Sequence, residues 1–150
     1  MSLTERIDSD YVQAYKAKDA LRLSVLRMVK TAVKNRLVEL RRPGGSLDDG
    51  ELMDVFIKEA KQRQDSIEQY TAAHRPDLAE KEAQELAILK EYLPQALSPE
   101  ELAAAIDATV AELGATGPRD MGRVISAVMN AFKGRVDGKE VSAAVKLRLS

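Results

Sequence analysis

Apolar side chains recur every three or four residues along almost the whole chain, which is the spacing of one face of an α-helix. No segment alternates apolar with polar residues over a convincing length, so the pattern of a β-strand is nearly absent. We therefore predict an all-α protein. The expected helices cover residues 3–17, 20–41, 48–73, 77–92, 99–113, 120–133 and 138–149.

Residues that end and start helices divide this pattern into two parts. The segment 42–45, Arg-Pro-Gly-Gly, stops the second helix because proline lacks a backbone donor and glycine tolerates positive φ; Ser46 can then cap the third helix. Ser98 stands three residues before Glu101, a spacing that satisfies the free N–H groups of a helix start. The domain boundary is expected just before Ser98. We predict an N-terminal helical domain of about four helices, residues 1–97, and a small C-terminal three-helix domain, residues 98–150.

Composition limits the class and location of the protein. The 150 residues contain no cysteine, which excludes disulfides and thiolate metal sites. The N-terminus lacks the pattern of a secretory leader, and no run of about 18 apolar residues occurs. Lys and Arg total 23 against 24 Asp and Glu, so the overall charge gives no hint of a nucleic-acid partner. We expect a cytoplasmic protein with no membrane partner and no cofactor.

Four charged residues fall on helix faces that are otherwise apolar. Glu59 and Arg63 lie at the centre of the inward stripe of the third predicted helix, and Glu82 and Glu85 lie within that of the fourth. Unpaired buried carboxylates are costly, so we expect a structural ion-pair network in which Arg63 bridges Glu59 and one of the other two glutamates. The alternative is a carboxylate metal site, but such sites inside helical bundles pair Glu with His, which this pattern lacks. No metal is expected.

Cations gather in two places along the chain. Arg27, Lys30 and Lys34 share one face of the second predicted helix, about a quarter turn from its apolar stripe. From Gly117 to Ser150, seven Lys and Arg stand against three Asp and Glu, a net charge of plus four. Each group is either a solvated surface or a track for the phosphates of a nucleic acid, and the sequence leaves both interpretations open.

The segment 133–139 is a candidate phosphate-binding loop. It combines the cations Lys133, Arg135 and Lys139 with two glycines, Gly134 and Gly138, directly before a helix whose free N–H groups favour anions. An ordinary helix connection can have the same composition, so the loop by itself does not distinguish a phosphate site from such a connection. The common motifs for nucleotide, acyl or zinc chemistry do not occur, and we predict no catalytic residue.

The succession of several short motifs along the chain resembles the YqeY family. The motifs are Leu26-Arg27-Met28-Val29-Lys30, the run from Glu59 to Ile67, Arg75-Pro76-Asp77-Leu78, Glu82-x-x-Glu85-Leu86, Tyr92-Leu93-Pro94, Asp120-Met121-Gly122-Arg123-Val124 and Gly134-Arg135-Val136-Asp137-Gly138. Together they span essentially the whole chain, and their order is far more specific than any one of them.

The resemblance implies a function. YqeY proteins resemble the C-terminal tail region of the B subunit of the glutamine-dependent amidotransferase that converts misacylated Glu-tRNA(Gln) or Asp-tRNA(Asn). That region is implicated in holding tRNA, while amide transfer belongs to other domains. We therefore expect a module that binds tRNA or other structured RNA, without autonomous catalysis. The expected RNA-binding residues are Arg119, Arg123, Lys133, Gly134, Arg135, Gly138 and Lys139, with Arg27, Lys30 and Lys34 extending the track.

Two other functions stay open on the sequence. The chain is alternatively an accessory subunit that docks on an aminoacyl-tRNA amidotransferase or synthetase through an apolar groove. The least favoured function is that of a carbon–nitrogen ligase with glutamine as amido-N-donor, a label that the family carries by association. The sequence supplies neither a glutaminase nucleophile nor a nucleotide site for that reaction.

Overall fold

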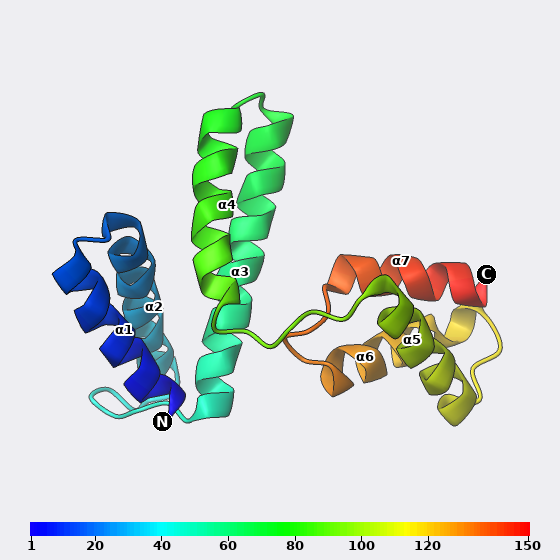
Figure 1. Ribbon diagram of the computed structural model, residues 1–150. Helices are drawn as coiled ribbons and strands as arrows, with labels where there is room; N and C mark the ends of the chain where they lie inside the picture. Colours follow the sequence, from blue (N-terminus) through cyan, green and yellow to red (C-terminus); the bar gives the residue numbers. More distant parts are fainter. The chain divides into compact units, whose positions relative to one another are not determined.

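The computed structural model describes residues 1–150, and all of its regular structure is helical (Figure 1). The prediction of an all-α protein is confirmed. The sixth helix is shorter than predicted, because a 3-10 turn precedes it and Phe132 leaves helical backbone angles (φ −117°, ψ 37°). The elements are α1 (Leu3–Ala17), α2 (Ala20–Glu39), α3 (Asp49–Ala72), α4 (Pro76–Lys90), α5 (Pro99–Leu113), the 3-10 turn η1 (Pro118–Asp120), α6 (Met121–Ala131) and α7 (Gly138–Leu149).

The chain folds into two compact units, Met1–Leu93 and Pro94–Ser150. The division lies four residues before the boundary expected after residue 97. A backbone hydrogen bond accounts for the difference, since the amide of Leu97 donates to the carbonyl of Arg135 at 2.9 Å. The segment that leads into α5 is thereby attached to the C-terminal unit.

The N-terminal unit packs α1 to α4 around one apolar core, and α3 and α4 run antiparallel as a long hairpin (Figure 1). Phe56 is fully buried at its centre, where its ring stacks on Tyr92 with 4.9 Å between centroids. Asp48 caps α3 and forms a capping box with Glu51, so the expected cap at Ser46 is wrong. The buried core residues are Ile7, Val25, Leu26, Val29, Leu37, Leu47, Leu52, Val55, Phe56, Ile88, Leu89 and Tyr92.

The C-terminal unit packs α5, α6 and α7 around a second core. Its centre is formed by valines of α6 and α7 that are fully buried, namely Val124, Val128, Val141 and Val145. The expected cap at Ser98 is confirmed, because its hydroxyl accepts from the amide of Glu101 at 3.1 Å and the Glu101 carboxylate accepts from the amide of Ser98. Each unit therefore has its own hydrophobic core.

Candidate functional site

Arg63 lies among three carboxylates in the N-terminal unit. Its Nη2 atom is 3.3 Å from Oε2 of Glu59, one turn earlier on α3. Its Nη1 and Nε atoms lie 3.7 Å and 3.4 Å from the Oε2 atoms of Glu82 and Glu85 on α4. The exposed fraction of these side chains ranges only from 8% for Glu85 to 17% for Glu82. The sequence suggested one glutamate from α4 as the second partner of Arg63, and the structure places both beside it.

This cluster, Glu59, Arg63, Glu82 and Glu85, holds three carboxylates for one guanidinium. Burial raises the pKa of Glu85, and the neighbouring Glu82 carboxylate raises it further against the opposing effect of Arg63. Nε of Arg63 and Oε2 of Glu82 are buried without a hydrogen bond, so their contacts are ion pairs only. The folded protein therefore favours a proton on Glu85 more than the unfolded chain does.

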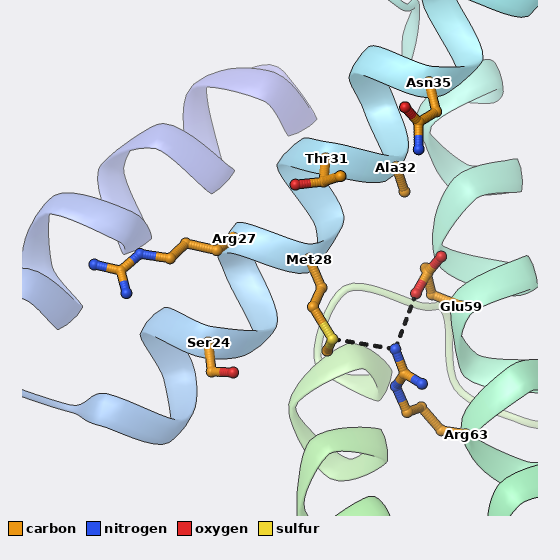
Figure 2. A pocket seen from close by; sticks show the side chains of 8 residues that line it. All are labelled: Ser24, Arg27, Met28, Thr31, Ala32, Asn35, Glu59 and Arg63. Atoms are coloured by element: carbon orange, nitrogen blue, oxygen red, sulfur yellow. Dashed lines mark hydrogen bonds and ion pairs between the residues drawn. The ribbon is translucent and has the colours of Figure 1, made fainter.

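A groove of about 480 Å³ opens beside the cluster, between α2 and α3 (Figure 2). At its inner side Nη2 of Arg63 donates to the sulfur of Met28 at 3.2 Å, which links α2 to α3. The α2 wall is one helix face, because its residues follow one another at alternating intervals of three positions and one position along about three turns. The groove is lined by Ser24, Arg27, Met28, Thr31, Ala32 and Asn35 of α2 and by Glu59 and Arg63 of α3.

Sequence reasoning missed this groove. The run of small and polar residues on α2 was the available signal, but such a face is typical of any solvated helix. The groove exists because α3 approaches that face with charged rather than apolar side chains. That approach depends on how the two helices pack, and packing cannot be predicted from the periodicity of either helix alone.

The cations expected on α2 have different surroundings. Arg27 is exposed, and its Nε donates to the hydroxyl of Tyr11 on α1 at 3.4 Å. Lys30 lies 3.2 Å from the Asp8 carboxylate and 4.3 Å from the centroid of the Tyr11 ring. Lys34 is exposed. Of the three, Lys30 is the one whose charge a carboxylate already neutralises.

Two of the expected cations of the C-terminal unit lie at the start of α6. Arg119 is exposed on η1. Arg123 is 58% exposed and its Nη2 lies 2.6 Å from Oδ1 of Asp120. The pKa of Asp120 is lowered, first by the amide of Thr116 and then by Arg123. Arg123 thus has a local counter-ion, whereas Arg119 is simply exposed.

The loop after α6 carries the other expected cations. Lys133 and Lys139 are exposed, while Arg135 is half-buried and donates from Nε to the carbonyl of Gln95 at 2.9 Å. Gly134 has a φ of 79°, a value that favours glycine. Gly138 is the first residue of α7.

A carboxylate already occupies part of this helix start. Asp137 accepts from the amide of Lys139 at 3.1 Å, so one of the N–H groups expected to bind phosphate has a partner. Since α6 has 11 residues, this loop lies about 16 Å from Arg119 at the other end of the helix. The structure therefore brings the C-terminal cations together as two groups at opposite ends of α6.

The model of the family described as Yqey-like protein matches residues 4–149. The chain belongs to the YqeY family. The resemblance of the motifs is thereby confirmed over essentially the whole chain.

Three curated relatives of this YqeY protein are named "Altered inheritance of mitochondria protein 41, mitochondrial". The protein of Lachancea thermotolerans is 38% identical over 107 residues, which cover 71% of this chain and 55% of the relative. Those of Candida glabrata and Saccharomyces cerevisiae are 34% and 36% identical over 89 residues, 59% of this chain and 48% and 47% of the relatives. The chain thus matches about half the length of these relatives.

The expectation of a cytoplasmic location is wrong, because the names of these relatives carry the word mitochondrial. The lack of cysteine, on which that expectation partly rested, does not distinguish one compartment of the cell from another. In the N- and C-terminal units alike, no helix is both long and apolar enough to cross a bilayer.

Proposed function

We propose that this YqeY protein binds structured RNA, with tRNA as its ligand, and that the C-terminal unit supplies the main contacts to phosphate. The observation that carries the proposal is a segregation of charge along the sequence of that unit. Helix α5 has four carboxylates and no cation, whereas residues 117–150 have a net charge of plus four. Side chains of Arg119, Arg123, Lys133 and Lys139 are exposed there.

The spacing of these cations supports contact with a nucleic-acid backbone. Arg119 and Arg123 lie at the start of α6, and Lys133 and Lys139 follow its end, about 16 Å away. Cations placed near the two ends of a helix can meet phosphates at two points of a folded RNA, which contributes affinity without reading sequence. Aromatic residues make up 4% of the chain, so phosphate and shape recognition are favoured over extensive stacking on bases.

Family membership supports the same function. YqeY proteins resemble the tail region of the amidotransferase B subunit, which is implicated in holding tRNA. Binding alone is sufficient for such a role, and no reaction is proposed for this chain. We assign a structural role to Arg135, because its hydrogen bond to the Gln95 carbonyl attaches the segment before α5 to the loop after α6.

The experiment measures the affinity for a labelled tRNA by fluorescence anisotropy at several salt concentrations. The test variant combines Arg119→Glu, Lys133→Glu and Lys139→Glu. The control combines Lys58→Glu, Lys61→Glu and Lys90→Glu, three exposed lysines of the N-terminal unit, and changes the net charge equally. We expect the wild type to bind, and the slope of log affinity against log salt to fall by about 2 to 3 in the test variant.

Two results would overturn the proposal. One is that the wild type fails to bind tRNA at low salt. The other is that test and control variants lose the same affinity, since overall charge rather than the C-terminal surface would then explain binding. Circular dichroism checks that both variants remain folded.

A further inference from the structure

We propose that the groove between α2 and α3 holds one unstacked nucleobase of the RNA, a base that carries an exocyclic amine. This inference rests on the proposed function and adds a second site to it, in the N-terminal unit. The groove has a volume of about 480 Å³. That volume lies within the range of about 300–1,000 Å³ typical of sites for small molecules.

The inner side of the groove suits the flat face of a base. Met28 and Ala32 supply its apolar surface, and the guanidinium of Arg63 lies next to the Met28 sulfur at 3.2 Å (Figure 2). Methionine sulfur makes favourable contacts with aromatic rings, and guanidinium groups stack on bases in RNA complexes. A base placed here would bury its face against side chains that the fold already holds in place.

The polar side chains of the α2 wall have unused hydrogen-bonding capacity. Ser24, Thr31 and Asn35 are exposed, and none of their side chains forms a hydrogen bond within the protein. Thr71 and Thr109 behave differently, because their hydroxyls bond to the carbonyl four residues earlier at 2.7 Å and 2.8 Å. The groove therefore offers two hydroxyls and one amide that can reach the edge of a ligand without breaking an existing contact.

The opposite wall selects for a donor on the ligand. Figure 2 shows the Glu59 carboxylate projecting from α3 into the space beside α2. Its Oε2 receives Arg63, while Oε1 has no partner in the protein. A carboxylate accepts hydrogen bonds only, so an amino group on the base is favoured at this wall. Guanine, adenine and cytosine carry an amino group with two N–H donors, whereas uracil offers only its single ring N–H.

The edge of the groove supplies a cation for the attached phosphate. Arg27 is one of the residues that line the groove, and Figure 2 shows its side chain extending from α2 toward α1. The side chain of Arg27 donates its one hydrogen bond to the Tyr11 hydroxyl at 3.4 Å, and its charge is not paired with a carboxylate. Unstacked bases occur at the single-stranded ends and loops of structured RNA. The groove would therefore bind a base from such an end or loop.

The test compares hairpin RNAs that share one duplex and differ at the 3′ end. One is blunt, one carries a short adenosine overhang and one carries a uridine overhang. The test variant, Thr31→Ala with Asn35→Ala, removes two groove hydrogen-bonding groups without changing charge. Its control, Gln69→Ala with Thr71→Ala, removes an amide and a hydroxyl near the C-terminal end of α3, outside the groove.

We expect the wild type to bind the adenosine overhang roughly tenfold more tightly than either other hairpin, as two added hydrogen bonds allow. The test variant should lose most of the added affinity for the adenosine overhang while keeping its affinity for the blunt hairpin, and the control should keep both. Equal binding of all hairpins by the wild type would overturn the groove assignment and leave RNA binding intact, as would equal preference for adenosine and uridine. Absence of binding to every hairpin and to tRNA would remove the proposed function together with this inference.

Discussion

Replacement of Arg63 by methionine tests the buried cluster most directly. Methionine retains much of the aliphatic stem of arginine but removes the positive charge that faces Glu59, Glu82 and Glu85. The exposed fractions of these three carboxylate side chains are 13%, 17% and 8%. The variant therefore leaves three carboxylates in poorly solvated positions with no cation beside them.

The expected loss of stability is large for one substitution. Removing one partner of a buried ion pair destabilises a protein by about 3–5 kcal/mol. Glu85 can relieve part of this loss by taking up a proton, because burial already raises its pKa. We therefore expect a loss of about 3 kcal/mol in the free energy of unfolding at neutral pH. The whole free energy of unfolding of a small domain is only about 5–15 kcal/mol.

The assay uses the tyrosines of the protein. All four, Tyr11, Tyr15, Tyr70 and Tyr92, belong to the N-terminal unit, and the chain has no tryptophan. Tyrosine fluorescence during urea unfolding therefore reports on the unit that contains the cluster. Arg22→Met is the matched control, since Arg22 pairs with an exposed carboxylate of the same unit and its loss should change stability by less than about 1 kcal/mol.

A compensating variant removes the arginine together with two of its carboxylate partners. Arg63→Met combined with Glu82→Gln and Glu85→Gln should recover most of the lost stability, because neutral amides need no cation. A loss below about 1 kcal/mol for Arg63→Met would show that the cluster contributes as little as a surface pair. Failure of the amides to restore stability would show that packing, not charge, is the cause.

Three further predictions concern single side chains. Because burial raises the pKa of Glu85, the folded state still binds this proton at pH values where the unfolded chain has released it. The stability of the wild type, measured as the urea midpoint, should therefore decline as pH rises above the ordinary carboxyl pKa. Glu85→Gln should flatten this dependence of the urea midpoint on pH. Ser98→Ala removes the α5 cap and should cost about 1 kcal/mol, measured by circular dichroism during urea unfolding; an unchanged midpoint would contradict the capping role. Tyr92→Phe removes the hydrogen bond to Asp10 and should cost about 1–2 kcal/mol in the urea titration, whereas an unchanged stability would mean that water replaces the bond fully.

The helices were predictable because each depends on local sequence. The stripe that contains Leu26, Val29 and Leu37 follows from periodicity alone, and its burial requires only that some core exists. The cap at Ser98 is equally local, since serine, proline and glutamate stand at fixed distances from one another. The wrong cap at Ser46 shows the limit of such signals, because Asp48, two residues on, offered the same chemistry.

The partners of charged residues were less predictable because they come from other helices. The sequence placed Arg63 among carboxylates, but the contact with Met28 depends on where α2 passes α3. Lys30 illustrates the same point, since its carboxylate partner Asp8 lies on α1. A single sequence shows which faces carry charge, whereas the neutralisation of that charge depends on the packing of helices.

The different surroundings of the cations assign different roles to the two units. Under the proposed function, exposed cations of the C-terminal unit such as Arg119 contact the phosphates, whereas Lys30 on α2 already pairs with Asp8. The groove between α2 and α3 instead offers uncharged hydrogen-bonding groups such as Thr31 and Asn35. Substitutions in the C-terminal unit should therefore change the salt dependence of binding, because counterions are released only where phosphates are contacted. Substitutions at Thr31 and Asn35 should lower the affinity for the adenosine-overhang hairpin by the same factor at every salt concentration, and a change in the salt slope there would contradict the division of roles.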